Sequence, residues 1–137
     1  MSVIELQSGD ARVTIDPERG GRLASWTARG RDLLVGPPTP DDRTIRWGCY
    51  LMAPWAGRLA NGRFEWAGAT AQMPRTHGRH AIHGLGWAAR WEVDAATSDR
   101  ATLSLDLASA GWPMGGRVTE TIRLRDDRLV LAVVTHE

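Results

Sequence analysis

Residues 118–134 read VTETIRLRDDRLVLAVV and carry the clearest structural signal in the chain. Two short runs, Val118–Leu124 and Leu129–Val134, are rich in β-branched and apolar residues and flank the polar turn Arg125-Asp126-Asp127. Apolar runs of this length on both sides of a polar turn are typical of a β-hairpin. Because the second run is apolar on both of its faces, we expect another layer, another segment or a partner chain to cover it.

The same pattern of short apolar runs between turn residues extends outward from this hairpin to the start of the chain. The strands that it predicts are Val3–Leu6, Ala11–Ile15, Arg22–Ala28, Leu33–Val35, Arg63–Trp66, Trp91–Ala95 and Ala101–Leu107. Residues 36–42, GPPTPDD, contain three prolines and are predicted to form a loop. No long run has helical periodicity, and no repeat or linker divides the chain. The sequence therefore predicts a single all-β sandwich or barrel domain over residues 1–137.

Composition excludes several classes of function. The formal net charge of +1 gives no electrostatic case for binding nucleic acid or an acidic membrane surface. No window approaches the roughly 20 apolar residues of a membrane span, and the start of the chain does not resemble a secretory signal. All 17 basic residues are arginine, which excludes lysine chemistry. A single cysteine cannot form an internal disulfide, so we expect a cytoplasmic protein.

Residues 47–91 concentrate the side chains that bear chemistry. This stretch holds five of the seven Trp, three of the four His, the only Cys and the only Phe. Aromatic faces beside directional polar groups suit a sugar ring, because its C–H faces stack and its hydroxyls need hydrogen bonds. A glycine-punctuated β-core filled with aromatic side chains is the alternative interpretation, and composition alone favours it.

Other chemistries find little support in this stretch. His77, His80 and His83 are spaced as zinc ligands on a helix would be, but the flanking glycines argue against a helix, so no metal is expected. No G-x-S-x-G elbow is present for a serine hydrolase. Cys49 lies in no nucleophile motif and is expected to be a small buried apolar residue.

Residues 48–64, GCYLMAPWAGRLANGRF, resemble the P-W-x-N-R-I-x-x-G-x-[YF] segment of the aldose 1-epimerase (galactose mutarotase)-like family. Ala81-Ile82-His83-Gly84 resembles the L-H-G motif that follows it, and the separation of Arg58 from His83, 83 − 58 = 25 residues, agrees with the family pattern. Residues 21–34 resemble the opening strands of that family. The similarity covers nearly the whole chain and corresponds to about the N-terminal half of a mutarotase.

The resemblance implies a galactose mutarotase-like β-sandwich (a supersandwich), of which the chain forms the N-terminal portion. It also implies interconversion of the α and β anomers of a free aldose, a monosaccharide such as a hexose, by acid–base ring opening without a cofactor. His83 would then be the catalytic histidine and a sugar contact, and Arg58 would hold the sugar. Trp55 is a candidate stacking surface for the ring, with core packing as the alternative.

The sequence departs from the family pattern in two ways. Gly57 stands where the family has an asparagine, and the residues 1–137 do not match the family's second histidine, its aspartate or its base glutamate. We therefore expect this chain alone to be catalytically incomplete. The alternatives are a non-catalytic carbohydrate-binding module and a self-associating module, in which a homodimer covers the C-terminal hairpin.

Overall fold

The computed structural model describes residues 3–137, which form twelve β-strands and two single-turn 3-10 helices. The strands of the first half are β1 (Ile4–Ser8), β2 (Ala11–Asp16), β3 (Arg22–Ala28), β4 (Arg31–Asp32), β5 (Arg58–Leu59) and β6 (Arg63–Trp66). The strands of the second half are β7 (Ala69–Gln72), β8 (Ala81–Ile82), β9 (Glu92–Ala96), β10 (Arg100–Asp106), β11 (Arg117–Arg125) and β12 (Arg128–His136). The 3-10 helices are η1 (Pro17–Arg19) and η2 (Ala60–Gly62). The described residues contain no helix long and apolar enough to cross a membrane.

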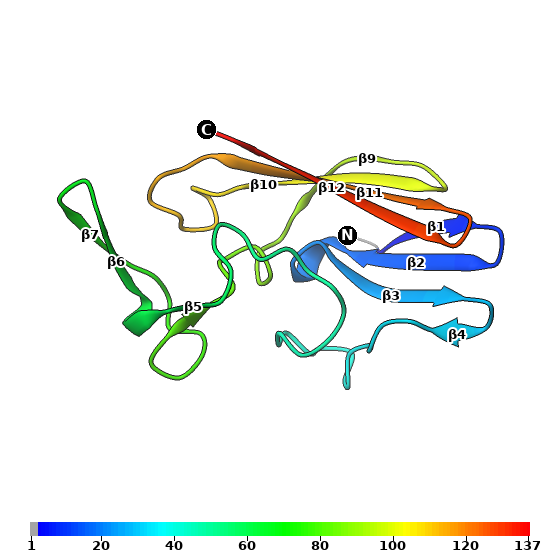
Figure 1. The fold of residues 1–137 in the computed structure, drawn as a ribbon, viewed down its shortest axis with the longest axis horizontal. Coiled ribbons are helices and arrows are strands. Elements are labelled where there is room, and N and C mark those ends of the chain that lie inside the picture. The colour runs from blue at the N-terminus through cyan, green and yellow to red at the C-terminus, as the bar shows by residue number, and fades with distance from the viewer. Residues whose placement is uncertain (1–2) are drawn as a thin grey trace.

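Two antiparallel four-stranded sheets form the body of the molecule (Figure 1). One sheet has the order β1-β2-β3-β4, and the other has the order β12-β11-β10-β9. Each is a meander in which successive strands pair as neighbours; η1 lies between β2 and β3, and residues 107–116 join β10 to β11. Residues 33–91 connect the two sheets and contain η2 and the small pairs β5-β8 and β6-β7. The β6-β7 hairpin projects away from the sandwich at one end of the molecule (Figure 1).

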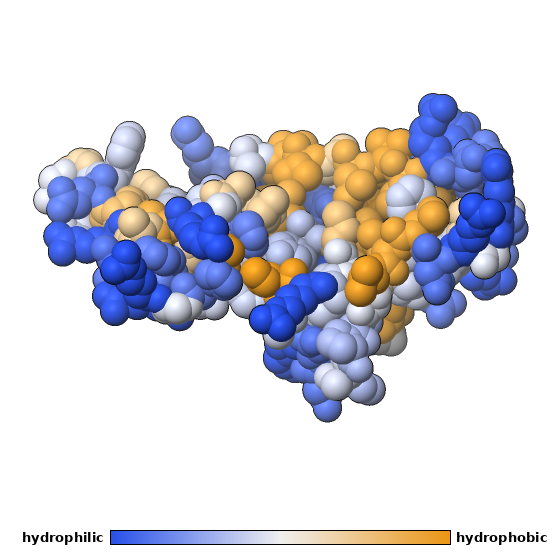
Figure 2. All heavy atoms as spheres, turned by 60° about the horizontal axis from the view of Figure 1, so that its bottom comes forward, coloured by the Kyte–Doolittle hydropathy of each residue, from blue (hydrophilic) through white to orange (hydrophobic). Residues whose placement is uncertain are grey.

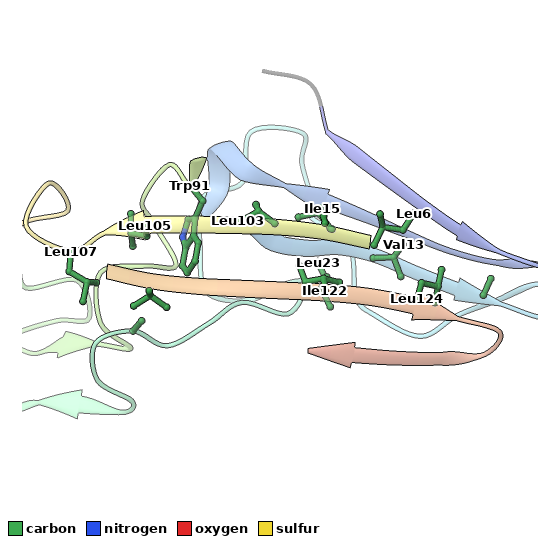
Figure 3. Close-up of a cluster of buried hydrophobic side chains, with 14 residues drawn as sticks. Leu6, Val13, Ile15, Leu23, Trp91, Leu103, Leu105, Leu107, Ile122 and Leu124 are labelled. Carbon is green, nitrogen blue, oxygen red and sulfur yellow. The ribbon is translucent and has the colours of Figure 1, made fainter. Parts of the chain in front are cut away.

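The core lies between the inner faces of the two sheets, as Figure 3 shows. Leu6, Val13 and Ile15 of the first sheet meet Leu103, Ile122 and Leu124 of the second, and all six side chains are fully buried. Trp91 closes one end of this core, and its indole Nε1 donates to the carbonyl of Gly86 at 2.9 Å. Burial alternates along β11, as expected for a strand with one face on the core.

Most of the predicted hairpins are confirmed. The β1-β2 and β9-β10 pairs and the β11-β12 pair lie where the sequence predicts them, within a few residues at each end. The strand predicted at Leu33–Val35 is wrong, because pairing with β3 is limited to Arg31 and Asp32 and ends before this run. The two-residue strands β5 and β8 were not predicted, because they are too short to show a periodic pattern.

Within residues 3–137, β12 stays largely exposed on both faces, so the segment or partner chain expected to cover it stays a prediction. β12 pairs with β11 over its whole length but lies at the edge of its sheet. Leu131 and Val133 on the inner face are 42% and 45% exposed, and Val130 and Val134 on the outer face are 47% and 52% exposed. Figure 2 shows hydrophobic atoms gathered in a broad band across one face of the molecule.

Glu120 is an acidic residue inside the sandwich. It lies on β11 between Val118 and Ile122, on the face that forms the core, and only 5% of it is exposed. Burial raises the pKa of its carboxyl group to about 7. The uncharged acid is therefore the form that the fold accommodates.

This pKa predicts that the protein loses stability as the pH rises. A carboxyl whose pKa is raised in the folded state stabilises the fold fully below its unfolded pKa, and this contribution is lost as the pH rises through about 7. We expect the Glu120→Gln variant to gain up to about 3 kcal/mol of unfolding free energy relative to wild type between pH 5 and pH 8. Urea denaturation at both pH values measures this change, with Glu5→Gln as an exposed control. A pH-independent difference between Glu120→Gln and wild type would contradict the prediction.

Candidate functional site

The small β5-β8 sheet brings Arg58 and His83 onto neighbouring segments. Arg58 pairs with Ile82, so His83 follows directly after β8 and lies beside Gly57. The His83 amide donates to the Gly57 carbonyl at 2.9 Å. Two residues that are 25 positions apart in the sequence are thus adjacent in the fold.

His83 occupies a backbone conformation that few residues with side chains adopt, with φ of +58°. Gly84 follows with φ of +72°, and a Cβ there would lie 2.1 Å from the Ala53 carbonyl oxygen. That carbonyl also accepts hydrogen bonds from the amides of Leu85 and Gly86, at 2.7 and 3.0 Å. Close backbone packing against Ala53 therefore holds the turn that carries His83, and this packing requires glycine at position 84.

A hydrogen bond to the ring fixes the orientation of the His83 imidazole. The Gly57 amide donates to Nδ1 at 3.1 Å. A ring nitrogen that accepts a hydrogen bond carries no proton, so the neutral imidazole is protonated at Nε2. Nε2 makes no hydrogen bond to any residue in the range 3–137. The half-buried ring lies near Tyr50, with 6.3 Å between the ring centroids.

An open hollow of about 630 Å³ lies beside His83 and Tyr50. Its lining combines apolar side chains with three polar ones from the segment that follows β4 and from the turn after β8. The lining residues are Leu33, Leu34, Val35, Ile45, Arg46, Trp47, Gly48, Cys49, Tyr50, Met52 and His83. The volume and the mixed lining are suitable for a monosaccharide-sized ligand.

Arg58 does not line this hollow. Its side chain is exposed, and its Nη2 atom lies 3.4 Å from Nε2 of His77. The structure thus brings Arg58 and His83 together through their backbones but directs the guanidinium group toward the loop that contains His77. The ring of His80, in the same loop, accepts a hydrogen bond from the Asn61 amide at 3.1 Å and ties this loop to η2.

Trp55 lies in an aromatic cluster outside the hollow. Its ring is 5.7 Å from that of Trp112, which stacks on Phe64 with centroids 5.1 Å apart. The half-buried indole has its Nε1 atom buried without a hydrogen-bond partner in the described residues. Trp87, by contrast, is buried and donates to the Ile82 carbonyl at 3.1 Å, so it supports β8 directly.

Several residues that line the hollow were not predicted from the sequence. The prediction that Cys49 is buried is wrong, because the residue is exposed; its backbone forms a two-way bridge to Leu23. Arg46 and Tyr50 were not singled out, although they lie in the aromatic-rich stretch. No group of three or more His, Cys, Asp or Glu side chains in residues 3–137 is arranged to hold a metal ion.

Arg22 is a buried residue behind the hollow, and its side chain contacts several of the segments that form the site. It is 1% exposed and donates hydrogen bonds to the carbonyls of Arg19, Thr44, Trp47 and Trp87 at 2.7, 2.9, 3.2 and 3.0 Å. Its guanidinium group also stacks on the rings of Trp47 and Tyr50, with centroid distances of 4.3 and 5.0 Å. These contacts join β3 to the two loops that form the site.

We expect the Arg22→Lys substitution to lower the unfolding free energy by about 2–4 kcal/mol. Lysine is a point charge that cannot reach four carbonyls at once, so buried acceptors lose their partners. Chemical denaturation with urea measures the loss. The exposed Arg12→Lys change is the matched control and should stay within about 0.5 kcal/mol of wild type. Equal stabilities of the two variants would contradict this role of Arg22.

Comparisons with known proteins agree on the class of fold. The chain superposes on a crystal structure of a putative aldose 1-epimerase from Escherichia coli K12 with a TM-score of 0.81 and 21% identity, covering 98% of this chain and 45% of that one. It superposes on the GalM/aldose epimerase homologue from C. elegans with a TM-score of 0.76 and 23% identity, covering 96% and 45% of the two chains. The fold is thus a galactose mutarotase-like β-sandwich.

Sequence comparison identifies the family. The aldose 1-epimerase family model matches residues 2–136, and the chain therefore belongs to the aldose 1-epimerase family. It is 31% identical over 113 residues to the uncharacterized protein YihR of Escherichia coli (strain K12), covering 80% of this chain and 36% of that protein. It is 24% identical over 135 residues to YphB of the same organism, covering 97% and 45%. The chain spans less than half of the length of these relatives.

Proposed function

We propose that residues 1–137 provide part of the sugar site of an aldose 1-epimerase, which interconverts the anomers of a free aldose. The observation that carries this proposal is the His83 imidazole, which the Gly57 amide fixes at the rim of the 630 Å³ hollow. Family membership over residues 2–136 supports the choice of reaction. In this proposal the domain is a single partial one, and its location is the cytoplasm.

His83 is the proposed catalytic residue. A neutral imidazole protonated at Nε2 can donate a hydrogen bond to a sugar oxygen, and histidine is the side chain that most often serves as a general acid or base. Arg58 and Trp55 remain proposed sugar contacts, Arg58 as a rigid fork for neighbouring hydroxyls and Trp55 as an aromatic face. Both lie outside the hollow that His83 lines, so a sugar that reaches them extends beyond it.

Ring opening needs a base as well as an acid. Since no glutamate of this chain matches the base of the family pattern, we propose that residues 1–137 alone bind sugar but do not accelerate anomer exchange appreciably. Glu120 does not line the hollow and belongs to the core.

We expect a fresh solution of α-D-glucose or α-D-galactose to change its optical rotation at the uncatalysed rate in the presence of the chain. NMR titration should still show sugar-dependent shifts around residues 50 and 83. The His83→Ala variant should bind roughly tenfold more weakly, since one ligand hydrogen bond of about 1.5 kcal/mol is lost. His136→Ala, at the exposed end of β12, is the control and should bind like wild type.

These measurements separate the alternatives. A His83-dependent acceleration of anomer exchange would show that the chain is a complete enzyme and would overturn the proposed incompleteness. Sugar-dependent shifts that His83→Ala leaves intact would favour a binding module with a different site. An absence of shifts with either sugar would overturn the sugar site.

Self-association is a second candidate function, and the exposure of β12 favours it. A second copy could extend the β12-β11-β10-β9 sheet and cover the apolar residues Leu131 and Val133. We expect light scattering after gel filtration to show a dimer whose fraction rises with concentration. The Val133→Arg substitution should shift it to monomer, whereas Thr70→Arg on the projecting β6-β7 hairpin should not. A strict monomer at high concentration would contradict this candidate.

A further inference from the structure

Residues 73–80, which join β7 to β8, hold the turn that follows Arg58 from outside. The Arg75 Nε atom donates to the Asn61 carbonyl at 3.1 Å, and the Asn61 amide donates to Nδ1 of His80 at 3.1 Å. Asn61 has a left-handed backbone with φ of +55°, a conformation that few residues with side chains adopt. Both polar groups of its backbone are thus bound by residues 73–80, which fixes the turn between β5 and β6.

His77 lies in a tight turn that is bonded to β8. The backbone amides of His77 and His80 each donate to the carbonyl of the other residue, at 2.9 and 3.1 Å. Thr76 Oγ1 accepts a hydrogen bond from the Ile82 amide at 3.1 Å, which ties this turn to β8. Since Ile82 pairs with Arg58, the backbone of His77 has a fixed position relative to that arginine.

The side chains of Arg58 and His77 meet between these two segments, with 3.4 Å from Nη2 to Nε2. Arginine only donates hydrogen bonds, so Nε2 is the acceptor and the neutral imidazole of His77 carries its proton on Nδ1. Within residues 3–137 this is the one hydrogen bond of the guanidinium group, and no carboxylate pairs with it. A carboxylate would occupy two donors and neutralise the charge, whereas the imidazole leaves Nε and Nη1 available for a ligand.

We propose that His77 is the positioning residue of Arg58: its imidazole holds the guanidinium group in one orientation, and Arg58 offers its remaining donors to neighbouring hydroxyls of the sugar. The inference rests on the proposed function, in which Arg58 is a sugar contact, and adds a residue to that site. An arginine side chain loses conformational freedom when it binds a ligand, and a contact that already restricts it in the free protein reduces this cost. His77 itself contacts no sugar and acts through Arg58.

NMR titration with D-galactose tests the role of His77. We expect His77→Phe, which keeps an aromatic ring but removes the acceptor, to bind about threefold to tenfold more weakly than wild type. His77→Gln, whose amide oxygen can accept from Arg58, should regain most of this affinity. In an Arg58→Ala background His77→Phe should have no further effect, because the two residues act as a unit. His136→Phe, at the exposed end of β12, is the matched control and should bind like wild type.

A second measurement follows the Arg58 side chain without sugar. We expect the NMR order parameter of its Nε–H group to fall in His77→Phe and to stay near the wild-type value in His77→Gln, because only the latter keeps an acceptor for Nη2. An order parameter that is the same in His77→Phe and in wild type would overturn the inference.

The outcomes distinguish this inference from the proposed function. Equal affinities of His77→Phe and wild type, with Arg58→Ala weakened, would overturn the role of His77 and leave the sugar site standing. A full loss from His77→Phe in the Arg58→Ala background would overturn it as well, because His77 would then act independently of Arg58. Wild-type affinity of Arg58→Ala would remove both residues from a site that His83 still defines. If D-galactose shifted no resonance of the wild type, both the inference and the sugar site would fail.

Discussion

The buried guanidinium group of Arg22 is the interaction on which the rest of the site depends. Residues 43–50 contain no extended strand, and the turn at 84–90 is irregular as well, so neither segment could hold its position through a sheet ladder. Arg22 satisfies carbonyls from both segments and from the end of η1. Together with the backbone bridge between Leu23 and Cys49, this side chain fixes the two irregular segments against a regular sheet.

The position of His83 shows the same dependence on irregular backbone. Its left-handed conformation is held by Gly84 against Ala53 and by the hydrogen bonds with Gly57, not by a long strand. Such a conformation persists only where surrounding contacts determine it, and it is found most often at functional sites. The result is an imidazole whose neutral tautomer is set by the main chain, so that a single nitrogen is available for a ligand.

The sequence predicted the sandwich because its strands form local hairpins, each marked by alternation and by turn residues. It could not predict the candidate functional site in the same detail. The β5-β8 pair has only two residues in each strand, and its formation depends on the pairing of Arg58 with Ile82 and of Leu59 with Ala81, which are 24 and 22 positions apart. The role of Arg22 has no sequence signal, because a buried arginine and an exposed one look alike among 17 arginines. The strand predicted at Leu33–Val35 and the burial predicted for Cys49 are both wrong, because pairing and burial depend on the neighbours that a residue meets in the fold and not on its type alone.

The ladder between β11 and β12 has a further consequence for the behaviour of these residues in concentrated solution. It runs without a bulge from Arg128 to His136, and the charged or titratable side chains of β12 lie only at its two ends. Natural sheets protect an open edge with proline, with inward-facing charges or with a bulge that twists the strand away, and this edge has none of these. Its backbone amides and carbonyls are therefore a template for any extended polypeptide, so an amyloid-like stack would begin here sooner than at the short β4 or the bulged β9.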